Sequence, residues 1–236
     1  MSSTDQDAQP DLADSWQEFT TLLIGLQQTG KVLADLDVTG EGGRNAATTV
    51  GDLARAETLT LTGGQQPPDG ALQKEPPTTG GVPLLTVPDL LMGTGPSGWL
   101  PTADAALVAE PGDVVVAGVS RAFSAWVHQG PPTALGPQLY ALRAVTDMLD
   151  AHFLAGCLRA PSNGRQAGTH ASSSSRVDVR RLHVLQLPLE HQRQYSEAFR
   201  TVKEFHSLLS QLDSLGTGLV NNLSDRLVTG RLPAGH

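Results

Sequence analysis

The chain has 236 residues, and its 24 acidic and 16 basic residues give it a formal net charge of −8. Its single cysteine, Cys157, excludes an internal disulfide and a zinc site built from cysteines. The neighbours of Cys157 are apolar, which predicts that it packs as a small buried hydrophobic residue. The sequence contains neither a charged-then-apolar signal peptide nor an apolar run of about 18 residues, so we expect a soluble, cytoplasmic protein.

The charge is unevenly distributed along the chain. Residues 1–37 contain seven acidic residues and one basic residue, whereas residues 159–203 contain eight basic residues and three acidic ones. A surface that faces nucleic-acid phosphates would therefore come from the second stretch. The negative total charge permits DNA binding but does not indicate it.

The N-terminal part predicts a tail followed by a helix. Residues 1–11 are polar and acidic, which is typical of a disordered segment. Residues 12–38 predict a helix, because apolar side chains recur there at steps of three, four, three and seven residues, with Gly30 in the missing position. These side chains form one half of an expected helix interface: Trp16, Phe19, Leu23, Leu26 and Leu33.

The middle of the chain, residues 48–187, predicts one β-rich domain. Alternating or β-branched runs predict strands, and segments rich in glycine and proline separate them. The expected strands cover residues 48–53, 58–62, 82–87, 106–118, 124–128 and 138–143. A helix is expected over residues 150–158, with Asp150 as its N-cap.

A second long helix is predicted over residues 188–228, followed by a tail at 229–236. Pro188 suits its first turn, and from Tyr195 to Leu223 apolar or small residues recur at alternating steps of three and four. A heptad pattern of this length favours a helix partner, and the alternative is packing on the chain's own sheet. The expected interface residues of this helix are Val202, Phe205, Leu209, Leu212, Leu219 and Leu223.

The fold class that follows is α+β, with one β-rich domain flanked by two long helices. We expect these helices to form an antiparallel coiled-coil-like pair, because the inserted domain returns the chain to the place where it left the first helix.

The catalytic and cofactor-binding patterns that we tested all fail. Residues 93–98 match G-x-G-x-x-G, but Pro96 and the following Trp-Leu-Pro predict no helix that could face a pyrophosphate. The chain has no Asn/Asp-Pro-Pro-aromatic tetrapeptide, the loop with which adenine-N6 methyltransferases hold the target amine. Its seven histidines lack metal-ligand spacing, and residues 118–122 match a nucleophile elbow only in part. We therefore expect no enzyme activity, no metal and no cofactor on this chain.

Residues 163–176 are the best candidate for contact with DNA. This expected loop contains short hydroxyl side chains, an amide and two arginines, which can donate to phosphates, and arginine and glutamine can also pair with guanine and adenine. The alternative is a solvated low-complexity loop without a partner. The candidate DNA-binding residues are Arg121, Arg165, Gln166, Thr169, Ser172, Ser173, Ser174, Ser175, Arg176 and Arg180.

The C-terminal half of the chain resembles a known family. Residues 172–195 resemble the end of the target-recognition domain in type I restriction-modification specificity subunits, where a hydroxyl-rich loop and a strand lead to a Pro-Leu-x-x-Gln helix start. That start corresponds here to Pro188, Leu189 and Gln192. The same residues are similar to the C-terminal recognition region of N6-adenine DNA methylases, but the catalytic domain that precedes it there is missing here.

Three earlier segments resemble parts of the same recognition domain, in the same order. They are residues 50–53, 81–90 and 110–116, so the resemblance covers roughly residues 48–228. A full specificity subunit has two recognition domains, each followed by a long helix. This chain, with one such domain and two helices, resembles a half-subunit.

The resemblance implies a non-catalytic component that recognises double-stranded DNA for a type I-like adenine methylation or restriction system. The recognition domain would read a half-site in the major groove, and the helices would pair with a second copy as a homodimer. They would also dock an N6-adenine DNA methyltransferase subunit, which would carry S-adenosylmethionine, and no membrane would be involved. The alternative function is a helical protein-interaction adapter that retains a degenerate recognition domain.

Overall fold

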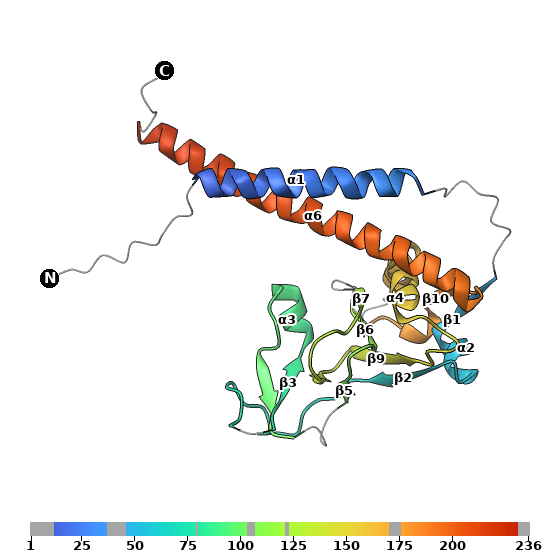
Figure 1. Ribbon diagram of the computed structural model, residues 1–236. Coiled ribbons are helices and arrows are strands. Elements are labelled where there is room, and N and C mark those ends of the chain that lie inside the picture. Colours follow the sequence, from blue (N-terminus) through green and yellow to red (C-terminus); the bar gives the residue numbers. More distant parts are fainter. Residues whose placement is uncertain are drawn as a thin grey trace. The chain divides into compact units, whose positions relative to one another are not determined.

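The computed structural model describes residues 12–36, 46–78, 80–102, 107–120, 123–169 and 176–230. The chain divides into two units, one formed by residues 1–40 with 200–236 and one formed by residues 41–199. The first, the helical unit, contains α1 (Leu12–Ala34) and most of α6 (Leu189–Val228); the second, the β-rich unit, contains the strands and the other helices (Figure 1). The α+β fold class predicted from the sequence is confirmed.

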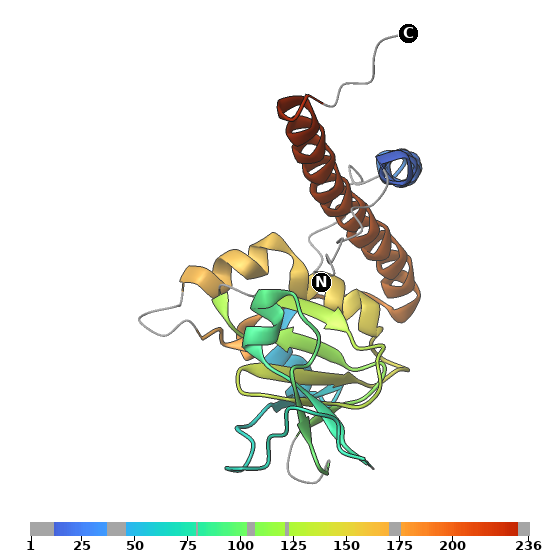
Figure 2. The ribbon, with the colours of Figure 1, turned by 90° about the vertical axis from the view of Figure 1, so that its left-hand side faces the viewer.

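In the helical unit, α1 and α6 lie side by side (Figures 1 and 2), and the colours in Figure 1 show that they run in opposite directions. A Cβ atom on Gly30 would lie 3.4 Å from the ring of Phe205, and one on Gly216 would lie 3.4 Å from the ring of Phe19. The contacts therefore move toward the start of α1 as they move toward the end of α6. The two helices thus contact each other at both glycines, at a distance where an added Cβ would make an ordinary van der Waals contact.

Small polar residues occupy the most buried positions of α1. Ser15 and Thr29 are each only 8% exposed, and the Thr29 hydroxyl donates to the carbonyl of Gly25 at 2.9 Å. On α6, Leu212 and Leu219 are buried. Since a buried hydroxyl needs a hydrogen-bond partner, the bond from Thr29 to its own helix makes this position tolerable.

Three sheets occur among the described residues of the β-rich unit. The first is fully antiparallel, in the order β2 (Leu59–Gly63), β9 (Leu139–Ala144), β6 (Val114–Ala117) and β7 (Ser124–Val127). The second has the order β4 (Gly98–Leu100), β3 (Val82–Leu85), β8 (Thr133–Leu135) and β5 (Val108–Ala109), and β3 and β8 are parallel. The third pairs β1 (Ala47–Thr49) with β10 (His183–Leu185).

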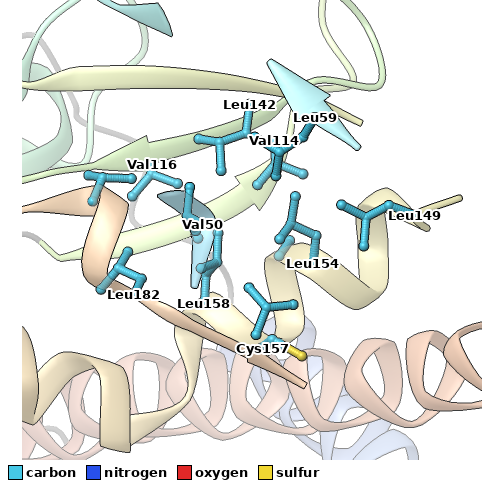
Figure 3. Close-up of a cluster of buried hydrophobic side chains, with 14 of the residues drawn as sticks. Val50, Leu59, Val114, Val116, Leu142, Leu149, Leu154, Cys157, Leu158 and Leu182 are labelled. Carbon is cyan, nitrogen blue, oxygen red and sulfur yellow. The ribbon is translucent and has the colours of Figure 1, made fainter. Parts of the chain in front are cut away.

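The main core lies between the first sheet and α4 (Ala151–Arg159). Residues 153–158 of α4 are all buried, and Figure 3 shows Leu154 and Leu158 among side chains contributed by the sheet, including Val114 and Leu142. Cys157 is buried in the same cluster, which confirms its predicted packing role, and burial raises the pKa of its thiol.

Two predicted strands end early because a capping box starts a helix in each. At the expected strand 48–53, the Thr49 hydroxyl accepts from the Asp52 N–H at 3.1 Å, the Asp52 carboxylate accepts from the Thr49 N–H, and α2 (Val50–Arg55) begins. At the expected strand 82–87, Thr86 and Asp89 form the same box and start α3 (Val87–Met92), with Pro88 in the first turn. A capping box satisfies two backbone donors, which outweighs the strand preference of Thr and Val.

Two other expectations need correction. The segment 106–118 carries the buried strand expected at its triple valine, β6, but also a second short strand, β5, and a turn in which Gly112 has a φ of 95° separates the two. The loop expected over residues 163–176 is helical in its first half, where α5 (Pro161–Thr169) forms directly after α4. Pro161 suits the first turn of a helix, and here it outweighs the turn-forming character of the residues that follow it.

Candidate nucleic-acid interface

The described part of the β-rich unit contains a hollow of about 300 Å³ that is lined by two arginines, one aspartate, and apolar and aromatic residues. Residues of β2 and β9 line one part of it, which we call the floor, and residues 176–180, which precede β10, line the other part, which we call the rim segment. We call the whole hollow the arginine hollow. Its lining residues are Leu61, Gly63, Tyr140, Arg176, Val177, Asp178, Val179 and Arg180.

Tyr140 forms the aromatic part of the floor and is held by two glycines. A Cβ atom on Gly118 would lie 2.5 Å from the Tyr140 ring, and one on Gly63 would lie 3.3 Å from it. Gly63 pairs with Tyr140 across β2 and β9. Only glycine leaves room for the ring at Gly118, so the ring position is set by the backbones of the neighbouring strands.

The rim segment alternates between buried and exposed residues. Val177 and Val179 are buried in the main core, whereas Arg176, Asp178 and Arg180 are exposed. The two buried valines anchor the segment in the core, and the charged side chains between and beside them remain at the surface.

Backbone hydrogen bonds fix this segment at both ends. The Val177 N–H donates to the Gly118 carbonyl at 2.9 Å, and the Val50 N–H donates to the Leu182 carbonyl at 3.0 Å. Between them, the Asp178 carboxylate caps the short 3-10 helix η3 (Val179–Arg181) by accepting from the Arg180 N–H at 3.1 Å. The arginine side chains therefore start from a rigid backbone.

Arg176 and Arg180, the two arginines of the rim, form no ion pair with any described residue. Arg181 lies 3.3 Å from the Asp178 carboxylate, Arg143 pairs with Asp113, and Arg55 pairs with Asp52. Within the described ranges, Arg176 and Arg180 have no carboxylate within 4.0 Å. Two unpaired guanidinium groups above an uncharged floor form a site suited to an anion.

Of the ten residues predicted to contact DNA, the structure brings Arg176 and Arg180 together at the arginine hollow. Arg165 is exposed on α5. Gln166 and Thr169 also belong to α5, but their side chains lie outside the described part of the chain, as do Arg121 and the four serines Ser172, Ser173, Ser174 and Ser175. Sequence reasoning missed Tyr140, Leu61 and Gly63, because only the pairing of distant strands brings them to the rim segment.

Asn163, the first residue of the predicted DNA loop, has a structural role instead. It is only 2% exposed, and its side-chain N–H groups donate to the carbonyls of Cys157 and His183, each at 2.9 Å. Its carbonyl oxygen accepts from the His183 N–H at 2.8 Å. Asn163 thus joins α4, α5 and β10, and it has no free group with which to read a base.

The Pro-Leu-x-x-Gln segment also has a structural role, at the start of α6. Gln192 is 5% exposed; it accepts from the Asp150 N–H at 2.9 Å and donates to the Leu187 carbonyl at 2.8 Å. Asp150 caps α4, as predicted, and accepts from the Ser196 hydroxyl. Burial raises the pKa of Asp150, but the hydrogen bonds from Ser196 and from the α4 backbone outweigh burial and hold this pKa below its ordinary value.

The predicted helix-interface residues fall into two groups in the helical unit. Six of them, Phe19, Leu26, Leu33, Phe205, Leu212 and Leu219, are partly or fully buried. The other five are between 37% and 50% exposed: Trp16, Leu23, Val202, Leu209 and Leu223.

The glycine-rich segment 93–98 has the wrong surroundings for a nucleotide loop. Gly93 ends α3 in the left-handed conformation with a φ of 67°, and β4 begins at Gly98. The order is therefore helix, loop and strand, the reverse of the strand, loop and helix that present N–H groups to a pyrophosphate. Among the described residues, no group of three or more His, Cys, Asp or Glu residues could hold a metal ion.

None of the described helices combines the length and the apolar character that are needed to cross a lipid bilayer. No family model matches the sequence, and no curated protein sequence matches it significantly.

Solved structures, in contrast, match nearly the whole chain. The HsdS subunit from Thermoanaerobacter tengcongensis matches with a TM-score of 0.53 and 18% identity, over 94% of this chain and 56% of its own. A chain from a structure on complex assembly and conformational transition of the type I R-M system matches with a TM-score of 0.53 and 15% identity, over 94% of this chain and 57% of its own. The type I restriction-modification S subunit from M. genitalium matches with a TM-score of 0.52 and 12% identity, over 95% of this chain and 59% of its own.

These matches show that the chain has the fold of type I specificity subunits, as the sequence motifs predicted. The chain spans a little more than half the length of the structures it matches.

Proposed function

We propose that this chain is the DNA target-recognition component of a type I-like adenine methylation or restriction system and has no catalytic role of its own. The observation that carries this proposal is the likeness of fold, which extends over 94–95% of the chain and includes both long helices. A fold alone does not define a function, so the surface must also suit DNA. Arg176 and Arg180, which form no ion pair within the part of the chain that the structure describes, supply a cationic site on the β-rich unit.

Two copies of the chain would form the working unit. The chain contains one β-rich unit, and it covers 56–59% of the length of the structures it matches. A twofold dimer presents two identical recognition surfaces and therefore selects a palindromic site with a fixed spacing between its halves. Methyl transfer and S-adenosylmethionine are assigned to a partner N6-adenine DNA methyltransferase.

The exposed apolar residues of the helical unit support pairing with a second copy. Val202, Leu209 and Leu223 lie at multiples of seven along α6, and Trp16 and Leu23 lie seven apart on α1. Each is more than a third exposed although it belongs to a heptad pattern. Such a pattern indicates a helix partner beyond the α1–α6 pair itself.

The dimer has a direct test. Replacing Leu209 and Leu223 together with glutamate should convert the dimer into a monomer with unchanged helix content, measured by light scattering and circular dichroism. The matched control replaces Ser210 and Ser224, which are exposed on another face of α6, with glutamate and should leave the mass unchanged. A wild-type chain that is monomeric at micromolar concentration would contradict the dimer.

DNA recognition is tested by selection from a randomised duplex pool. The purified chain is incubated with the pool, with and without a candidate N6-adenine methyltransferase, and bound duplexes are sequenced. We expect enrichment of a split palindromic site. Failure to enrich any sequence in either condition would overturn the proposal.

A protein-interaction adapter is the competing function, and the exposed apolar stripes on α1 and α6 favour it. The two functions differ in their need for the arginine hollow. Substituting Arg176→Glu together with Arg180→Glu should abolish the enrichment if the chain recognises DNA. An adapter should assemble with its protein partner equally well before and after this change.

A further inference from the structure

We infer that the arginine hollow holds one phosphate of the DNA backbone between Arg176 and Arg180 and thereby sets the position of the β-rich unit along the duplex. The inference rests on the proposed function and adds the chemical group that this site binds. It separates the two arginines from the residues that read base edges.

The charge balance of the hollow favours a phosphate. Arg176 and Arg180 both line it and are unpaired within the described ranges, whereas the nearby Arg181 is paired with Asp178 at 3.3 Å. The Asp178 carboxylate also accepts from the Arg180 backbone N–H, so both of its oxygens are engaged away from the two arginine side chains that line the hollow. The planar guanidinium group binds phosphate oxygens in a forked geometry, and two such groups can hold one phosphate from two sides.

The floor suits the deoxyribose that accompanies a phosphate. Leu61 and Gly63 carry no polar side-chain group, and Tyr140 presents a ring to the hollow. Among the described residues, the Tyr140 hydroxyl has no hydrogen-bond partner, so it can donate to a phosphate oxygen. The volume of about 300 Å³ exceeds that of a phosphate group alone and leaves room for the attached sugar.

The rigidity of the rim favours backbone contact over base reading. Buried Val177 and Val179 and the hydrogen bond from Val177 to Gly118 fix the positions from which both arginines project. Phosphates repeat along every duplex at fixed spacing, so a rigid clamp meets one on any sequence. A base could enter the hollow only after leaving the helical stack, which costs unstacking and unpairing.

The test combines neutral DNA linkages with substitutions in the hollow. A selected duplex is prepared with a single methylphosphonate at each backbone position in turn, and its affinity is measured for the wild-type chain and for Arg176→Gln with Arg180→Gln. We expect one position at which the neutral linkage weakens wild-type binding but leaves the double variant unchanged. The slope of log K against log salt concentration should fall by about 0.9 in the double variant, the value for one phosphate.

Two further variants make the test specific. Arg193→Gln removes an exposed arginine on α6 away from the hollow, and it should keep the wild-type slope and the wild-type methylphosphonate pattern. Arg176→Lys with Arg180→Lys keeps the charge but not the fork, and it should retain the slope while lowering affinity. Circular dichroism of each variant checks that it is folded; if the glutamine double variant is unfolded, the single variants Arg176→Gln and Arg180→Gln replace it.

The outcomes separate this inference from the proposed function. If the wild-type chain selects a sequence but the double variant keeps the same salt slope and the same methylphosphonate pattern, the phosphate clamp is wrong. A changed base preference in the double variant would also overturn it, because the arginines would then read bases. If the wild-type chain selects no sequence, the proposed function fails. The same methylphosphonate scan on one fixed duplex then still decides whether the hollow contacts a phosphate. If the chain does not bind this duplex even at low salt, both the proposed function and the phosphate clamp are wrong.

Discussion

Asn163→Asp is a nearly isosteric change that tests whether Asn163 holds α4, α5 and β10 together. The asparagine donates to two carbonyls, those of Cys157 and His183, and accepts from the His183 N–H. Aspartate retains the acceptor, but it places a carboxylate oxygen against the two carbonyls that now receive N–H groups. The substitution therefore removes two hydrogen bonds at a site that is only 2% exposed.

The expected loss in the free energy of unfolding is about 2–4 kcal/mol at pH 7, from two buried hydrogen bonds lost at about 1–2 kcal/mol each. The loss should appear as a urea midpoint lowered by on the order of 1 M with an unchanged slope. Urea unfolding is followed by tryptophan fluorescence, and hydrogen exchange of peptides from α4 and β10 locates the change. Asn221→Asp, at an exposed position of α6, is the matched control and should be neutral.

The pH dependence gives this prediction a second, independent readout. Burial and the two facing carbonyls raise the pKa of the introduced carboxyl above its unfolded value, so the folded state is favoured when this group is protonated. The destabilisation relative to wild type should therefore be largest at neutral pH and should shrink as the pH falls through the raised pKa, because the protonated acid can donate to one carbonyl. A variant as stable as wild type at pH 7, or one whose deficit grows on acidification, would refute the reasoning.

Two more predictions concern the β-rich unit. Asp113→Asn should cost about 1–3 kcal/mol at pH 7, because Asp113 is 3% exposed and accepts from Arg143 Nε and Nη2 at 2.8 Å each. Burial raises the pKa of Asp113, but Arg143 and the Glu110 N–H outweigh burial and hold this pKa below the ordinary value. The stabilisation by Asp113 is therefore present above about pH 4 and is lost as the pH falls through the folded pKa. The urea midpoints of the variant and the wild type should thus converge in acid. Gly156→Ala should lower the free energy of unfolding by about 1–3 kcal/mol, because the new Cβ would lie 2.1 Å from a ring carbon of Phe199. Adding Phe199→Leu should recover part of that loss. Simple additivity of the two changes in a double-mutant cycle would contradict the steric explanation.

Local signals in the sequence determined several elements of this fold. The triple valine at 114–116 forms the buried strand β6, Asp150 caps α4, and the apolar periodicity locates both long helices. Short-range signals that compete were harder to weigh: the Thr-x-x-Asp boxes at Thr49 and Thr86 convert expected strand residues into helix starts. Both patterns were visible in the sequence, but β-branched residues suggest a strand and a capping box ends it.

The tertiary structure decided what these elements do. A heptad pattern shows that a helix has an apolar stripe, but it does not show which side of a broad stripe another helix covers. On α6, Leu212 is buried, whereas Leu209, three residues earlier, is 43% exposed. Asn163 looks like a loop residue in the sequence. Only the approach of Cys157 and His183 in the fold makes it a buried residue whose side chain links two elements by hydrogen bonds.

The candidate site shows the same division. Sequence reasoning selected Arg176 and Arg180, since basic residues beside a hydroxyl-rich run suit phosphates. It could not find Tyr140 or the glycines that hold its ring, because these belong to strands far away along the chain and reach the rim segment only through sheet pairing. Composition and periodicity determine local conformation and apolar faces, whereas the meeting of distant residues depends on how the whole unit packs, which no local pattern records.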